Sequence, residues 1–74
     1  MNFHTVEDLE RAEHHVALSE KHISRQRELI AELERDGYDT QLAAELLSTL
    51  EESQAAHIAD RNRLKAELSW RETH

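Results

Sequence analysis

The sequence contains no cysteine and no proline, and Gly37 is its only glycine. The absence of cysteine excludes disulfides and thiol nucleophiles, and it fits a reducing compartment. No apolar run approaches the ~20 residues that a membrane-spanning helix needs. Residues 1–4 also lack the basic-then-apolar order of a signal peptide. We therefore expect a soluble, cytoplasmic protein with no membrane partner.

Basic residues are few as well, with 9 against 16 acidic residues, and the net charge of the 74-residue chain is −7. Nucleic-acid binding needs a basic face that neutralises phosphates, so we expect no nucleic-acid partner. A chain this short buries only about 60% of the surface that unfolding exposes, which limits it to one small unit. An acidic face could still occupy the basic groove of another protein.

Gly37 marks a tight reversal between two helices, because a glycine in left-handed conformation ends a helix without a Cβ penalty. Leu33 and Tyr38 then occupy the two positions whose apolar contact accompanies a Schellman motif. Asp39 or Thr40 caps the second helix, and the sequence does not choose between them. The alternative, one continuous helix of nearly seventy residues, conflicts with these adjacent stop and start signals.

The first helix has its start signal at Thr5, which is followed three residues later by Asp8 in the form of a capping box. Beyond it, apolar residues recur every seven positions, as in one core position of a coiled coil. These residues are Leu9, Val16, Ile23 and Ile30. We predict helices at about 5–36 and 40–71 around a turn at 37–39, within a single domain that covers 1–74.

The second helix carries a broader apolar stripe than one neighbouring helix can cover. We therefore predict an all-α, antiparallel, coiled-coil-like two-helix hairpin that self-associates into a four-helix bundle. A homodimer is favoured over a trimer or tetramer, and the competing possibility is a different protein bound in helix-in-groove fashion. The residues assigned to the oligomer core are Leu9, Val16, Ile23, Ile30, Leu33, Leu46, Leu47, Leu50, Leu64 and Leu68.

Folding the chain at residue 38 pairs positions whose numbers add to about 76, so Ile30 meets Leu46 or Leu47. In this register the basic residues Lys21, Arg25 and Arg27 lie opposite Glu51 and Glu52. A polar layer interrupts the apolar seam at matching levels of the two helices: Ser19, Glu20, Gln26, Ser53, His57 and Arg61. Polar groups at such positions are known to fix register and oligomer number. We expect His57 to bond to Glu20 across the hairpin.

Six histidines are the candidate metal ligands: His4, His14, His15, His22, His57 and His74. Metal sites on helices commonly use ligands at i and i+3 or i+4, and no two of these histidines have that spacing. His15 and His22 share a face but stand about 10 Å apart along the axis. We therefore expect no metal and no other cofactor.

Ser53, His57 and Glu20 could form a hydrolytic triad on paper. Such a triad also needs an oxyanion hole and a concave pocket, which a glycine-poor helical rod does not offer. We expect no enzymatic activity and no catalytic residue. Trp70 is expected to cover Phe3 or Val6 at the open end of the hairpin, or else to anchor a partner, since tryptophan is enriched in binding hot spots.

Scattered residues between about positions 15 and 68 carry a resemblance: His22, Ile23, Arg25, Gln26, Arg27, Leu33, Glu34, Gly37, Asp39, Thr40, Leu46, Leu47, Leu50, Ser53, His57, Arg61 and Leu64. They resemble small uncharacterised helical-hairpin proteins of rhizobia and related bacteria. Similar segments are attached to bacterial sensory proteins, so the resemblance implies a place in signalling or stress response. It implies no activity, cofactor or active-site residue.

These observations predict a non-enzymatic, homo-oligomerising interaction or regulatory module. The alternative is an acidic adaptor or inhibitor that binds a basic protein surface. Association through leucines should persist at high ionic strength, whereas association through acidic faces should weaken.

Overall fold

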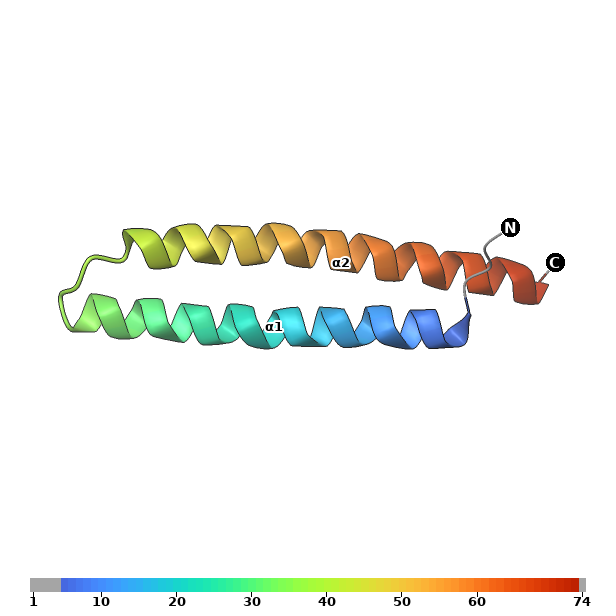
Figure 1. Cartoon of the computed structure of the whole chain (residues 1–74), viewed down its shortest axis with the longest axis horizontal. Helices are drawn as coiled ribbons and strands as arrows, with labels where there is room; N and C mark the ends of the chain where they lie inside the picture. The colour runs from blue at the N-terminus through green and yellow to red at the C-terminus, as the bar shows by residue number, and fades with distance from the viewer. Residues whose placement is uncertain (1–4, 74) are drawn as a thin grey trace.

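The computed structural model describes residues 5–73, which form two helices joined by a short turn. Helix α1 spans Val6–Arg35 and helix α2 spans Gln41–Thr73. The helices run antiparallel and side by side, so the turn lies at one end of the molecule, and the start of α1 and the end of α2 lie at the other (Figure 1). The resulting rod measures 58 × 16 × 15 Å. Within residues 5–73, no helix has both the length and the apolarity that crossing a membrane requires.

Helix α1 starts at the predicted capping box. The Oγ1 atom of Thr5 accepts a hydrogen bond from the backbone N–H of Asp8 at 3.2 Å, and the N–H of Thr5 donates to Oδ2 of Asp8 at 2.8 Å. Two N–H groups that the helix leaves without a backbone partner are therefore satisfied. Glu7 and Asp8 also place negative charge at the positive end of the helix dipole.

The turn has the backbone bonds of a Schellman motif. The N–H of Tyr38 donates to the carbonyl of Leu33 at 2.9 Å, and the N–H of Gly37 donates to the carbonyl of Glu34 at 3.2 Å. Gly37 has a φ of +76°, the left-handed conformation that only glycine adopts without penalty. The side chain of Tyr38 is 67% exposed, so backbone bonds, and not burial of the ring, close the turn.

Helix α2 begins with a cap that Asp39 and Thr40 share. The carbonyl of Thr40 accepts the N–H of Ala44 at 2.8 Å, which is the first bond of the helix. The carboxylate of Asp39 accepts the N–H of Gln41 at 3.0 Å. The two residues left open by the sequence therefore act together, one through its backbone and the other through its side chain.

The interior is one thin seam between the helices. Its buried apolar residues are Ala12, Val16, Ile23 and Leu64. Among residues 5–71, no side chain falls below 2% exposure, because each helix has a neighbour on only one side. A two-layer arrangement of this kind leaves much of the apolar surface of each helix in contact with water.

Candidate functional site

The predicted oligomer-core residues lie at different depths. Val16, Ile23 and Leu64 are buried between the helices. The residues of intermediate exposure are Leu9, Ile30, Leu33, Leu47, Leu50 and Leu68. Leu46 is 50% exposed and Leu47 is of intermediate exposure, so Leu47, and not Leu46, faces the seam. Leu46 is therefore available for contacts outside the hairpin.

The predicted polar layer is only partly brought together. Gln26 is buried, and its Nε2 atom donates to the backbone carbonyl of Ala43 on the other helix at 2.9 Å. The hydroxyl of Ser19 donates back to the carbonyl of Val16 in its own helix at 2.8 Å. Gln26 therefore makes a hydrogen bond that ties α1 to α2, whereas Ser19 satisfies itself locally.

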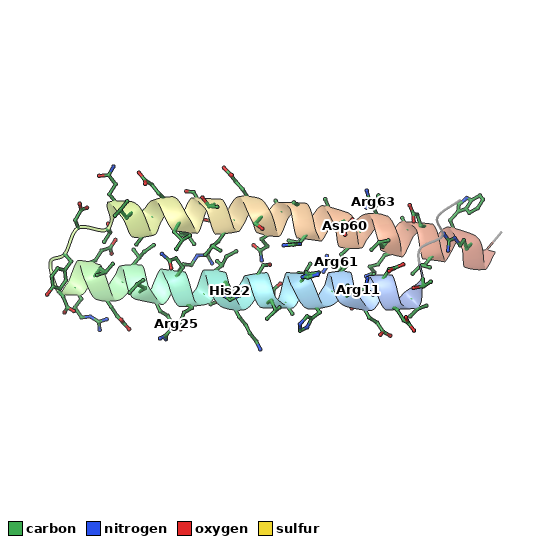
Figure 2. All side chains as sticks on the ribbon, viewed as in Figure 1. Arg11, His22, Arg25, Asp60, Arg61 and Arg63 are labelled. Carbon is green, nitrogen blue, oxygen red and sulfur yellow. The ribbon has the colours of Figure 1, made fainter. Side chains whose placement is uncertain are left out.

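Arg61 and Arg25 make local contacts as well. The guanidinium of Arg61 donates to the side-chain oxygen of Asn62 at 3.0 and 3.2 Å, and Figure 2 shows its side chain between the two helices. Arg25 points away from α2 and pairs with Glu28 of its own helix at 3.6 Å (Figure 2). Arg25 therefore pairs within α1, and not with Glu51 or Glu52 of the second helix as the sequence predicted.

A histidine cluster occupies the middle of the rod. The rings of His15 and His57 stack across the two helices, with centroids 5.4 Å apart and planes tilted by 13°. The hydroxyl of Ser53 lies 3.5 Å from Nε2 of His57. These three residues and His22 line one shallow hollow of about 200 Å³ with Leu18, Ser19 and Leu50.

The same face of the rod continues toward the turn as leucine. Leu29 lies seven residues after His22, and Leu46 lies seven residues before Ser53, so each repeats the position of a hollow-lining residue two turns away. Leu42 precedes Leu46 by one turn and shares its side of α2. We call this surface the leucine–histidine face. Its residues are His15, Leu18, His22, Leu29, Leu42, Leu46, Ser53 and His57.

The opposite edge of the rod is polar, and we call it the charged flank, defined by Glu20, Arg27 and Glu51. Arg27 and Glu51 form an ion pair between the helices at 3.7 Å, which agrees with the predicted charge register. Glu20 is exposed and lines a hollow formed by α1 residues alone, with Lys21 and Ser24 among them. The structure therefore does not bring Glu20 to His57, whose ring contacts His15 instead.

Around His57 the described side chains meet through a ring stack and a hydroxyl–imidazole contact. Ser53 and His57 are close, but Glu20 lines a separate hollow on α1. The three residues considered as a hydrolytic triad therefore do not come together. Among the side chains of residues 5–71, no group of three or more histidine, cysteine, aspartate or glutamate side chains is arranged to hold a metal ion. His4, His74 and Phe3 lie outside the described residues.

Trp70 lies near the end of α2 and is 62% exposed beside Ala66, Glu67 and Arg71. Val6, one of the two residues that it was expected to cover, is itself 60% exposed. Trp70 therefore leaves most of its surface open to solvent at the end of the rod opposite the turn.

Sequence reasoning missed two features of this site. Gln26 was assigned to the polar layer, but its bond to the carbonyl of Ala43 was not foreseen, because Ala43 lies about two turns from the predicted level of Gln26. The stacking of His15 on His57 was also missed, since the predicted register set Ser19 opposite His57. The seven-residue relation among His15, His22 and Leu29 was the available signal for this face.

Comparison with known protein families, with curated proteins and with solved structures finds no match to this chain.

Proposed function

We propose that this hairpin is a non-enzymatic interaction module that self-associates through its leucine–histidine face, two copies forming a four-helix bundle. The observation that carries the proposal is the exposure of large apolar side chains on one face of a rod whose opposite edge is charged. The four leucines of that face leave uncovered the equivalent of about two leucine side chains per copy: Leu18 38%, Leu29 43%, Leu42 81% and Leu46 50% exposed.

The energy of covering this surface favours a second copy without making the contact permanent. Burial of the leucines in both copies stabilises a dimer by roughly 6–12 kcal/mol, which is comparable to the ~4–15 kcal/mol that association costs. Contacts of the half-buried seam residues with a second hairpin add to the favourable side. We therefore expect a reversible dimer whose dissociation is measurable at micromolar concentration.

Charge separates this proposal from its alternative, an acidic adaptor or inhibitor of a basic protein. The net charge of −7 makes two copies repel each other weakly, and salt screens that repulsion. Association through the leucines should therefore hold or strengthen as ionic strength rises. Binding of a basic protein through acidic side chains should weaken over the same range.

The role in the cell that we propose is regulatory: a small oligomerising module in bacterial signalling or stress response, in the cytoplasm. The support for this assignment is the resemblance of the chain to helical hairpins of rhizobia and related bacteria. A reversible dimer suits such a role, because its population follows the amount of protein present.

The test is the apparent mass of the purified protein by light scattering at a fixed micromolar concentration, from low to high salt. An apparent mass above 8.6 kDa that holds or rises as salt increases supports the leucine contact. A dimer that dissociates as salt increases would show that ionic contacts hold it, and would overturn the proposed contact face.

A further inference from the structure

The leucine–histidine face is not uniform along the rod, and this asymmetry restricts how two copies can pack. Near the turn its exposed apolar side chains are Leu29, Leu42 and Leu46, and Arg25 and Glu32 line a hollow beside Leu29. Near the open end the same side of the rod presents ion-paired charges. Arg11 pairs with Asp8 at 3.3 Å, and Arg63 pairs with Asp60.

The charged section adjoins the histidine cluster directly. Asp8, Arg11 and Asp60 line one hollow together with His15, and His15 also lines the hollow around His57. The order along the face, from the turn to the open end, is therefore leucines, histidines and charges. Trp70 lies beyond the charges, at the far tip.

Two hairpins that bury this face against each other have two simple arrangements. If the turn of one copy lies beside the open end of the other, Leu29 and Leu46 cover Arg11 and Asp60. That packing removes ion-paired charges from water without giving them new partners, which is costly. If both turns lie at the same end, leucines meet leucines.

The charges tolerate this second arrangement because both signs are present at their level. Asp8 and Asp60 balance Arg11 and Arg63, so two copies of this section do not set a single sign of charge against itself. A two-fold interface brings the same patch of each subunit together. The section is therefore compatible with its own copy.

We propose, on the basis of the self-association proposed above, that two copies pack with their turns at the same end and a two-fold axis along the rod. Leu29 and Leu46 of one copy contact the same residues of the other. His15, His22 and His57 of the two copies meet at the middle of the bundle. Trp70 lies beside its own copy at the far tip.

The absence of cysteine makes this arrangement measurable with single spin labels. Asp36→Cys places a label at the turn, and Glu10→Cys places one toward the open end, each at an exposed position. Distances between labels on different copies are then measured by pulsed electron paramagnetic resonance. A far-ultraviolet circular dichroism spectrum identical to that of the unlabelled protein serves as the control for folding.

The same-end arrangement predicts that the two labels at position 36, and likewise the two at position 10, lie within about twice the 16 Å width of the rod. A mixed sample, labelled at 36 on one copy and at 10 on the other, should add a separation of about 40 Å or more, because most of α1, at ~1.5 Å per residue, lies between the two positions. The reverse pattern, long for like positions and short for the mixed sample, overturns this orientation but leaves self-association intact. A mass of 8.6 kDa with no distance between copies overturns both proposals.

Discussion

Replacement of Leu46 by aspartate should separate assembly from folding. Leu46 is 50% exposed in the hairpin, so the change removes little of the contact between α1 and α2. In the proposed dimer the same side chain becomes buried. Since full burial of a leucine contributes about 1.5–3 kcal/mol, the exposed half is worth about 1 kcal/mol in each copy. Two symmetric copies lose about 2 kcal/mol before the cost of burying two carboxylates is added.

A loss of about 2 kcal/mol corresponds to a dissociation constant that rises roughly thirtyfold. Sedimentation equilibrium over a range of protein concentrations measures that constant directly. Ala44→Asp is the matched control, because Ala44 is also exposed, lies two residues away, and points from the opposite side of α2. If Leu46→Asp and Ala44→Asp dissociate the protein equally, or neither does, the leucine–histidine face is not the contact surface.

Three further predictions concern the turn, the histidine cluster and metal ions. Gly37→Ala should destabilise the fold by about 1–2 kcal/mol and lower the melting temperature. The cost comes from the backbone φ of +76°, since no atom within 4 Å would obstruct the added Cβ. An unchanged melting temperature would show that residue 37 is not left-handed. His57→Leu should keep the helix content and raise or barely alter the melting temperature, while it yields mixed oligomers in size-exclusion chromatography. A single uniform species would instead place His57 on a free surface. Stoichiometric zinc should leave the melting temperature unchanged, because the stacked rings of His15 and His57 do not direct their nitrogen atoms at one metal position. A stabilisation that His15→Ala abolishes would reveal a metal site between copies.

The turn and the start of α1 could be predicted from the sequence, because each depends on hydrogen bonds among a few neighbouring residues. Gly37 and the capping box of Thr5 and Asp8 act within one turn of helix, where no distant residue competes. The hairpin follows from them, since a single left-handed residue between two long helices leaves them few ways to pack other than side by side.

The packing between the helices was harder to predict, because α2 is apolar around much of its circumference. Leu46 and Leu47 are adjacent, and either could face α1 until the structure set Leu47 toward the seam. When leucine occurs on several sides of a helix, its spacing does not define which side packs against the neighbouring helix. Long side chains add to the difficulty, because Gln26 reaches the carbonyl of Ala43 well away from its own level.

The measurement that tests the central claim most directly is the mass of the unmodified protein by sedimentation equilibrium, at concentrations that extend below and above the micromolar range. Self-association through the leucine–histidine face predicts a reversible shift from 8.6 kDa toward twice that mass as concentration rises, at low and at high salt alike. A folded, purely helical species that remains at 8.6 kDa at every concentration would contradict it.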